Sequence, residues 1–546
     1  MAAALPLSRP APQEAPRPRR LGVGFPLAFA AILATVSLVP YVLAYVMTPP
    51  GHHFAGFFFI ADDATTYLAK MRQGADGSWL WSDPYTSEPH GGVFLFGFYL
   101  LLGHLAALAH IPLVAAYHVA RISGGLALVF AVDRLGRRIL RPELRRLALV
   151  IVVLGSGFGF LVQLAGNPGV FGQRLEALDL HLPEITGWYS ILAIPHFAWA
   201  TAFILLSLVG LLAIAEHPRV QVVIGTGASL LALSAIHPQM VAVILGIWCM
   251  YRLVLAAWGR RPSLRSLIAE AGAFALAVPL LAYNAWILLN DPTIASWAQQ
   301  WRHQAPNLPS LVVSLGLPLI GAAYGAWLTW RRRDTNLALL MVWLPLVLVL
   351  LYLPNLANIQ RRLLDAVYVP IGILAVVGLH EVVTHLPRRR GRMLQRVLVP
   401  VACLSSGLVL AIALRFATGA FPEAYIDDGR WQAMSWLATN HTAGDRALSS
   451  PGSGLFLPAW SGVSVYVGHY SETVDYFKKI ATANGILSAG SSALAVESFV
   501  RDNRITLLFW GSLETQATGY QPDAKAYWRP IFRNGSVAIY RFQAQP

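Results

Sequence analysis

Residues 21–47 read LGVGFPLAFAAILATVSLVPYVLAYVM, and this stretch decides the fold class of the chain. It holds no charged residue, and a helix needs roughly 20 apolar residues to cross a hydrocarbon core about 30 Å thick. The run is too long for a removable signal peptide, and no small-residue cleavage site follows it. We therefore expect a membrane-spanning helix, with the Arg/Pro-rich leader of residues 1–20 on the cytoplasmic side.

The composition of the whole chain indicates many such helices. Of its 546 residues, 56% are hydrophobic and 12% are charged, whereas a soluble protein carries about 25% charged residues. In a soluble protein, the formal net charge of +14 would suggest a nucleic-acid partner. Here the arginines cluster in short loops between apolar runs, so we expect a multi-pass protein of the cytoplasmic membrane and no nucleic-acid partner.

Twelve apolar runs approach the length of a membrane span. They cover residues 21–47, 92–109, 113–132, 147–165, 194–215, 220–236, 240–257, 267–289, 311–330, 337–353, 366–385 and 397–414.

The positions of arginine decide how many of these runs cross. If all twelve did, the Arg-rich loops would face outward, against the rule that short basic loops stay in the cytoplasm. If the run at 92–109 lies along the membrane instead, all these loops turn inward. That run holds Gly97, Gly103 and His104 and follows a polar loop, so we expect eleven spanning helices. The Arg-rich loops are residues 134–146, 260–265, 331–333 and 388–396.

Residues 416–546 differ from the membrane module of residues 21–415. Charges return, helix-length apolar runs stop, and residues 430–440 have the pattern of an amphipathic helix. We expect a small α/β domain outside the cytoplasm, with a loop at residues 451–454. Neither a G-x-G-x-x-G nor a Walker motif suggests a nucleotide. Short strand-like runs occur at residues 464–467, 505–509 and 537–540.

An acidic pair opens the helical part of the first outer loop. Asp62 and Asp63 are adjacent, and two neighbouring carboxylates repel each other, so at least one is expected to have a raised pKa unless a cation compensates. This environment suits a general base. The alternative is that one of the two aspartates only caps the helix that runs through Tyr67.

Basic and polar residues at other outer helix ends are candidates for a phosphate site. Arg361 and Arg362 form an adjacent pair, and a guanidinium matches a phosphate with two hydrogen bonds. The alternative is that both arginines extend to lipid headgroups. His237 and Gln239 flank a proline between two runs, where His237 is otherwise only a turn residue.

Three further groups complete the candidate residues. Asp179 and His181 have the chemistry to bind a divalent cation, with a solvated loop as the alternative. His469 and Glu472 lie at a strand-to-helix junction of the C-terminal domain and are candidates for acceptor binding, together with Tyr67 of the first loop. Ordinary loop chemistry is the alternative for His469 and Glu472.

The whole arrangement resembles the GT-C superfamily of membrane glycosyltransferases, which includes protein O-mannosyltransferases, lipid A aminoarabinose transferases and oligosaccharyltransferases. The similarity covers the architecture of the chain: a first span, an outer loop with membrane-parallel helices, many spans and an outer C-terminal domain. In the first loop, the residues similar to the family pattern are Asp62, Asp63, Tyr67, Gly74, Trp79 and Pro84.

The resemblance implies an inverting transferase that moves a sugar from a polyprenyl-phosphate donor to a glycan, lipid or protein acceptor at the outer face of the membrane. Asp62 or Asp63 would be the base or would position a metal. Asp179 and His181 look like the second acidic motif with which oligosaccharyltransferases help to hold a divalent cation.

Two other functions compete with this interpretation. A transporter or lipid flippase usually needs several ionisable residues at mid-membrane depth. Asp133, Glu270 and Glu381 all fall near inner helix ends, and Arg121 is the one exception. A non-catalytic cell-envelope assembly protein is the third possibility, which the acidic pair of the first loop disfavours.

Overall fold

A computed structural model describes residues 24–170, 172–300, 303–353, 359–419 and 424–544. The leader of residues 1–20 lies outside these described residues. The first element is helix α1 (Gly24–Val46), which confirms the helix expected from the opening apolar run.

Eight helical segments of the described chain are long and apolar enough to cross a membrane, and two helices bent by 45° form a ninth. The bent pair is α12 (Leu264–Ala275) with α13 (Val278–Asn290). The shorter apolar helices α10 (Val220–Ser234) and α16 (Ala338–Tyr352) lie at two further expected spans, so the count of eleven stays a prediction. The other segments are α1, α4 (Leu113–Ile139), α5 (Pro142–Leu154) with α6 (Gly159–Leu164), α9 (Pro195–Glu216), α11 (Pro238–Ala257), α15 (Leu308–Arg332), the 3-10 helix η1 (Gln360–Leu364) with α17 (Tyr368–Thr384), and α18 (Arg388–Val401) with α19 (Leu404–Thr418).

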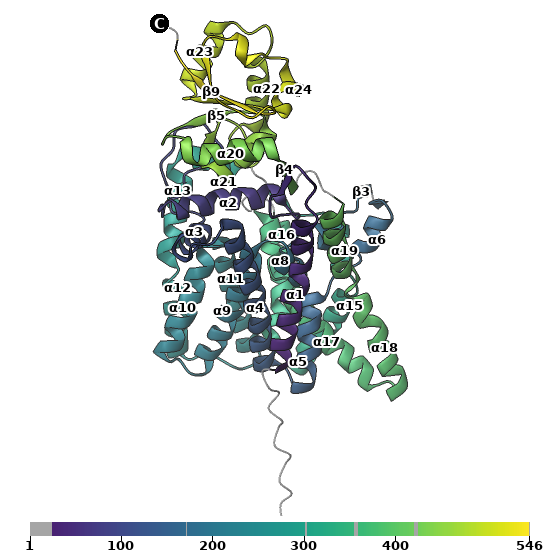
Figure 1. Cartoon of the computed structure of the whole chain (residues 1–546). Coiled ribbons are helices and arrows are strands. Elements are labelled where there is room, and N and C mark those ends of the chain that lie inside the picture. The colour runs from purple at the N-terminus through teal and green to yellow at the C-terminus, as the bar shows by residue number, and fades with distance from the viewer. Residues whose placement is uncertain (1–23, 171, 301–302, 354–358, 420–423, 545–546) are drawn as a thin grey trace, which may run out of the picture.

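The first outer loop forms helices α2 (Ala61–Ala75) and α3 (Gly97–Ala109). Figure 1 shows α2 lying across the end of the bundle, beneath the C-terminal domain, and α3 beside it. A Cβ atom on Gly103 would lie 1.9 Å from the carbonyl oxygen of Met71, and one on Gly74 would lie 2.1 Å from that of Leu100. These two glycines therefore bring the backbones of α2 and α3 into contact, which explains the glycine inside an apolar run.

Short elements connect the spans on the same side as α2. They are the hairpin of β2 (Gly169–Val170) and β3 (Gln173–Arg174), and helices α7 (Leu178–His181), α8 (Gly187–Leu192) and α14 (Pro292–Gln300).

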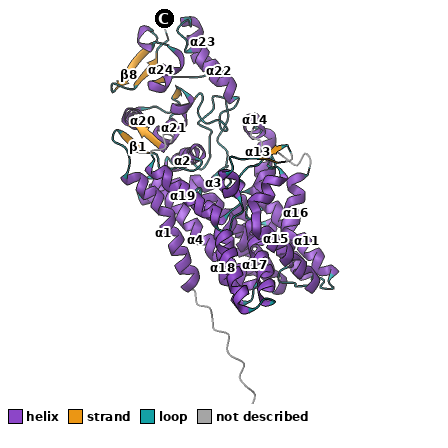
Figure 2. Ribbon diagram, turned by 90° about the vertical axis from the view of Figure 1, so that its right-hand side faces the viewer, coloured by secondary structure: helices purple, strands orange, loops and turns teal. Residues whose placement is uncertain are grey.

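The C-terminal part contains a five-stranded sheet with the strand order β6-β5-β7-β9-β8, as expected for an α/β domain. Strand β5 pairs in parallel with β6 and β7, whereas β9 pairs antiparallel with β7 and β8. Figure 2 shows this sheet beyond the helix bundle. The elements are β5 (Arg446–Leu448), β6 (Ser464–Val465), β7 (Leu507–Trp510), β8 (Trp528–Arg533), β9 (Ala538–Phe542), α20 (Asp428–Asn440), α21 (Pro451–Ser461), α22 (Tyr476–Ile486), α23 (Ala493–Asp502), α24 (Ser512–Thr518) and the 3-10 helix η3 (Pro522–Ala524).

A separate pair of strands ties this domain to the first outer loop. Strand β4 (Tyr425–Asp427) pairs antiparallel with β1 (His52–Phe54), so that His52 faces Asp427 and Phe54 faces Tyr425. Two segments that are far apart in the sequence are thereby fixed side by side next to α2.

The loop expected at residues 451–454 is wrong, because helix α21 begins there. Ser450 is its N-cap and accepts a hydrogen bond from the N–H of Ser453, and Pro451 occupies the first turn. Serine at the N-cap followed by proline is a typical helix start. The two glycines within residues 451–454 favour a loop and outweighed this helix-start signal in the sequence.

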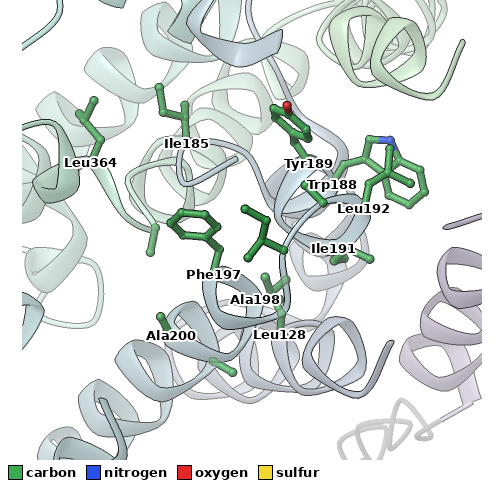
Figure 3. Packing of buried hydrophobic residues seen from close by; sticks show 14 of the residues in the cluster. Leu128, Ile185, Trp188, Tyr189, Ile191, Leu192, Phe197, Ala198, Ala200 and Leu364 are labelled. Atoms are coloured by element: carbon green, nitrogen blue, oxygen red, sulfur yellow. The ribbon is translucent and has the colours of Figure 1, made fainter. Parts of the chain in front are cut away.

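The core at the end of the bundle nearest α2 is made by α4, α8 and α9. Figure 3 shows Leu128 of α4 beside Ala198 of α9, with Ile191 and Leu192 of α8 packed close by. Phe197 points from the start of α9 into the same core, and the guanidinium of Arg362 lies 5.3 Å from its ring centre. The packed core thus supports the charged guanidinium of Arg362 at its edge.

Arg121, the ionisable residue inside a span, is held by main-chain contacts, by Nδ1 of His118 at 3.2 Å and by aromatic packing. Its guanidinium donates to the carbonyl oxygens of Ile191 at 2.8 Å and Ser37 at 3.4 Å, and lies 4.6 Å from the ring centre of Tyr41. These contacts join α1, α4 and α8, so Arg121 has a structural role in the bundle.

Candidate active site

Helix α2 places the acidic pair at the surface between the bundle and the C-terminal domain. The helix begins at Ala61, and its N-cap is Ile60, which has a left-handed backbone and supplies no side-chain cap. Neither Asp62 nor Asp63 is therefore the N-cap, although both lie in the first turn, where the helix dipole favours negative charge. The capping alternative from the sequence is wrong in this respect.

Asp63 contacts a histidine of the C-terminal domain. Its Oδ1 lies 3.3 Å from Nε2 of His469, outside strict hydrogen-bond geometry. Burial acts to raise the pKa of Asp63, but the contact with His469 and the charges of His469, Arg362 and Lys70 outweigh it and hold the pKa below its ordinary value. The raised pKa expected for an uncompensated carboxylate is therefore not found at Asp63, where cationic neighbours compensate the charge.

The orientation of His469 follows from its second ring nitrogen. Nδ1 accepts from the main-chain N–H of Ser471 at 3.3 Å and lies 2.9 Å from the hydroxyl oxygen of Ser471. Because Nδ1 is an acceptor, the ring proton of a neutral His469 resides on Nε2, which faces Asp63.

A buried ion pair fixes α2 against the same domain segment. Nζ of Lys70 lies 2.8 Å from Oε1 of Glu472, and both side chains are almost fully buried. The amide of Gln300 donates to the carbonyl oxygens of Ser471 at 3.2 Å and Thr473 at 3.0 Å. The structure therefore places Glu472 as a tether to Lys70, and the segment around His469 is held from two sides.

A cavity of about 300 Å³ opens on the bundle side of α2, and we call it the bundle cavity. Its aromatic wall includes Tyr67, which stacks on Tyr99 with ring centres 4.3 Å apart, and the hydroxyl of Tyr99 lies 2.6 Å from Nδ1 of His196. No carboxylate lines the cavity among the described residues. The polar and charged side chains of the lining are Tyr67, Tyr99, His196, His237, Gln239, His303 and Arg362.

Two acidic residues orient the basic side chains of this cavity. Nδ1 of His237 pairs with the carboxylate of buried Asp365, which leaves Nε2 for the cavity. Nη1 of Arg362 lies 4.0 Å from Oε1 of buried Glu184. Burial, together with the charges of Arg362 and Arg361, lowers the pKa of His303 to about 3, so this side chain is neutral.

Arg361 and Arg362 do not have the same surroundings. Arg362 lines the bundle cavity. Arg361 turns to its neighbours, with Nε 3.5 Å from Oε1 of Glu184 and Nη2 3.0 Å from Nδ1 of His303. Only Arg362 thus has a direct path to a ligand in the cavity.

A second cavity, of about 390 Å³, lies between α2 and the C-terminal domain, and we call it the domain cavity. It is lined by Asp62, Arg430, His469, Tyr470 and Tyr476 among others. Its wall combines aromatic faces with polar groups, a lining common in ligand sites.

Asp63 lines neither cavity itself, but its neighbours line both. Its contact residue His469 lines the domain cavity, whereas Tyr67, one turn along α2, and Arg362, whose charge lowers its pKa, line the bundle cavity. Residues i and i+4 share a helix face, so a carboxylate at this position faces groups held on either side.

The predicted cation residues Asp179 and His181 have different surroundings in the structure. Oδ2 of buried Asp179 accepts from the N–H groups of Gly157 at 2.9 Å and Gly159 at 3.3 Å, whereas the His181 side chain is exposed. Within the described ranges, no group of three or more metal-ligating side chains has the arrangement to hold an ion. The contacts of Asp179 fit a main-chain clamp better than a cation ligand.

The structure brings most of the predicted site residues together but adds partners that the sequence did not indicate. His196, His303, Asp365 and Glu184 complete the bundle cavity and its support. Each lies at a helix end on the side of α2, and that shared position was the available signal. Their pairing depends on contacts between segments more than fifty residues apart, which one sequence does not reveal.

No protein-family model matches the chain, and no curated protein matches it. Solved structures do match. The Archaeoglobus fulgidus oligosaccharyltransferase tethered with an acceptor peptide has a TM-score of 0.56 at 12% identity, over 95% of this chain and 74% of that one. The mycobacterial arabinofuranosyltransferase AftD has a TM-score of 0.53 at 16% identity, over 95% of this chain and 40% of that one.

A third similar structure is ArnT from Cupriavidus metallidurans in the apo state, with a TM-score of 0.51 at 13% identity over 94% of this chain and 98% of that one. All three are membrane glycosyltransferases of the GT-C type. The resemblance expected from the sequence is confirmed for the fold: this multi-pass membrane chain has the GT-C architecture.

Proposed function

We propose that the protein is an integral membrane glycosyltransferase that moves a sugar from a polyprenyl-phosphate donor to an acceptor hydroxyl or amide. The observation that carries this proposal is the position of Asp63 between a cavity lined by cationic and aromatic groups and a second, open cavity at the C-terminal domain. The GT-C architecture supports the same class of reaction.

In this proposal the bundle cavity holds the donor. Arg362 supplies the charge for the phosphate, and Nε2 of His237 and the amide of Gln239 supply hydrogen bonds. The aromatic wall of Tyr67, Tyr99 and neighbouring rings packs against the sugar and the first isoprene units. Arg361 supports this arrangement through Glu184 rather than by touching the phosphate.

The acceptor enters through the domain cavity, where Tyr470 and Asp62 line its path to Asp63. Asp63 accepts the proton of the acceptor group as its heteroatom attacks the anomeric carbon. The bond between that carbon and the phosphate oxygen breaks, and polyprenyl phosphate leaves with the bonding electrons. Attack opposite to the leaving group inverts the anomeric configuration.

His469 has a positioning role in this mechanism. It lies 3.3 Å from Asp63 and lowers the pKa of that carboxyl group, which keeps Asp63 ionised and ready to accept a proton. Glu472, paired with Lys70, keeps the segment that carries His469 in place. Glu472 therefore acts without lining either cavity, whereas His469 also lines the domain cavity through which the acceptor enters.

The reaction is proposed for the outer face of the cytoplasmic membrane. Arginines cluster at the helix ends opposite to the C-terminal domain, such as Arg137 and Arg138 of α4 and Arg331 and Arg332 of α15. Short basic loops face the cytoplasm. A cysteine placed at exposed Ser512 should react with an impermeant thiol reagent in intact cells, and labelling only after lysis would place the domain inside.

The central experiment offers purified protein a panel of radiolabelled polyprenyl-monophosphate sugars with membrane and envelope extracts as acceptor. We expect one donor to be consumed, with release of polyprenyl phosphate, and the D63N variant to bind that donor without consuming it. Donor binding with no consumption by the parent protein in any extract would contradict the catalytic proposal. Equal turnover by D63N would contradict the assignment of the base.

A further inference from the structure

An apolar groove lies in the membrane part of the molecule, far from both cavities described above. Helix α18 stands off the bundle at the end opposite to the C-terminal domain (Figure 1). The space of about 310 Å³ between it and the bundle has an apolar lining, apart from the hydroxyl of Tyr324. Its walls include Ile320 and Tyr324 of α15, Val382 of α17, and Leu394 and Leu398 of α18.

Five arginines lie near the N-terminal end of the same helix, α18. All five side chains are exposed, and no described carboxylate forms an ion pair with any of them. The nearby Glu381 is already paired with Arg332 of α15. The arginines are Arg388, Arg389, Arg390, Arg392 and Arg396.

The depth of the groove matches one leaflet of a bilayer. Helix α18 runs from the arginine cluster to the groove residue Leu398, and at a rise of about 1.5 Å per residue its whole length is roughly 20 Å. Trp327 and Trp330 of α15 are exposed near the same end. Exposed tryptophans and arginines together mark the membrane–water interface, so the groove leads from the headgroup level into the hydrocarbon region.

We propose that this groove binds an anionic phospholipid, with one acyl chain along α18 and the phosphate against the α18 arginines. Unpaired arginines at headgroup level attract anionic lipids, and an apolar groove directly beneath them holds a chain in register with that headgroup. The site lies at the opposite end of the bundle from Asp63, so it does not hold the donor of the proposed reaction. The inference stands independently of the proposed function.

The test measures lipid binding to the purified full chain by native mass spectrometry. We expect phosphatidylglycerol to bind saturably and at least tenfold more tightly than phosphatidylcholine with the same acyl chains. The triple variant R388Q/R389Q/R392Q should reduce this preference to within about threefold. The matched control R260Q/R261Q/R265Q removes three exposed arginines from a loop whose residues do not line this groove, and it should retain the preference.

A second variant tests the groove itself. Leu398 is half-buried in the wall, and L398W fills the space while leaving every arginine in place. We expect L398W to weaken phosphatidylglycerol binding at least fivefold; the L394W variant on the same wall is used if L398W does not fold. Retained phosphatidylglycerol binding in a folded Trp variant would show that the acyl chain does not lie in the groove. Only attraction between the arginines and the headgroup would remain, and the proposal would be overturned.

Two competitors identify the source of the phosphate. Free glycerol phosphate should not displace phosphatidylglycerol at equimolar concentration, because it lacks the acyl chain. Displacement by glycerol phosphate would mean a simple anion site and would overturn the proposal. Displacement by polyprenyl phosphate at concentrations tenfold below those of phosphatidylglycerol would assign the groove to that lipid and would overturn it as well.

Discussion

The first and second outer segments both carry an aspartate that the sequence marks as functional, but the two side chains have opposite surroundings. Asp63 is partly exposed and contacts His469, a titratable side chain of another domain. Asp179 is buried and accepts its hydrogen bonds from main-chain N–H groups of Gly157 and Gly159. The pKa of Asp63 is lowered, mainly by His469 against the effect of burial, whereas burial raises that of Asp179.

This difference separates a carboxylate available for chemistry from one used to hold the chain together. Main-chain donors cannot change their protonation state, so a carboxylate bound to them stabilises one loop conformation. A carboxylate beside a histidine and an arginine has a pKa that these neighbours lower, and a phosphate bound nearby would change the charge around it. The predictions below test whether the two aspartates have these separate roles.

The largest effect is expected from D63N. Asparagine keeps the size of the side chain but does not accept the acceptor proton, so turnover should fall by roughly a hundredfold or more. Donor binding should persist, because the bundle cavity is unchanged. The measurement is single-turnover transfer of labelled sugar, together with donor affinity.

The neighbouring D62N variant is the matched control for D63N. Asp62 is exposed and lines the domain cavity rather than facing His469. We expect D62N to raise the acceptor KM by a few fold with little change in kcat. If both Asn variants keep turnover within a few fold of the parent, neither aspartate is the base and the comparison with Asp179 loses its basis.

A smaller but distinct effect is expected from R362Q. Loss of a charged hydrogen bond to the phosphate should weaken donor binding by about 1.5 to 3 kcal/mol, or roughly tenfold to a hundredfold. The charge of Arg362 also contributes to the lowered pKa of Asp63. R362Q should therefore shift the acidic limb of the kcat/KM profile to higher pH as well.

R361Q separates direct from indirect contact with the donor. Arg361 contacts Glu184 and His303 and does not line the bundle cavity. We expect its Gln variant to weaken donor binding less than R362Q does. Equal losses in a donor titration would mean that both arginines grip the phosphate, as the sequence alone suggested.

The architecture could be predicted from the sequence because membrane insertion has a strong one-dimensional signal. Apolar length marked the long apolar helices, and the arginine loops led to the prediction that residues 92–109 do not cross, where the structure has the short apolar helix α3. The loop expected at residues 451–454 was wrong because two glycines outweighed the cap signal of Ser450 and Pro451. Local helix signals are weak unless every residue agrees with them.

The site could be predicted only in part, since its contacts are long-range. Asp63, Arg362 and His237 were identified as individual polar residues in outer segments. The pairing of Asp63 with His469 joins positions in different domains, and the pairing of His237 with Asp365 joins two helix ends. Such contacts arise from packing, so the sequence indicated the residues but not their partners.

The H469N variant tests whether His469 lowers the pKa of Asp63. It removes the contact and the charge that lower the pKa of Asp63, while burial continues to raise it. A carboxyl group with a lowered pKa stays ionised until the pH falls below 3.8, the ordinary pKa of an aspartate. Without His469 that pKa rises, so activity should be lost at a higher pH than in the parent.

The pH–rate profile of kcat/KM measures this shift and separates it from acceptor binding. A residue that only binds acceptor would raise the acceptor KM and leave the acidic limb in place. If the acidic limb of the profile stays at the same pH while the acceptor KM rises, His469 binds the acceptor instead of setting the pKa of Asp63. The E472Q variant is the structural control, because it weakens the tether to Lys70 but keeps Lys70 and His469, two of the side chains whose charges lower the pKa of Asp63.

The smallest effect on catalysis is expected from D179N. Asparagine still accepts from the N–H of Gly157 or Gly159, but through a neutral oxygen, so unfolding should become easier by about 1 kcal/mol. Turnover per folded molecule should remain within twofold. Because burial raises the folded pKa of Asp179, the folded state binds its proton more tightly than the unfolded state. The resulting stability is present below the unfolded pKa and is lost as the pH rises through the folded pKa.

The parent should therefore gain stability relative to D179N as the pH falls toward 4, since the variant lacks this proton. Thermal unfolding of the purified protein at neutral and acidic pH measures the difference. A hundredfold loss of turnover with an unchanged midpoint, reversed by added Mn²⁺ or Mg²⁺, would instead make Asp179 a cation ligand. In that case both outer segments would take part in the chemistry, and a main-chain clamp would no longer distinguish the two aspartates.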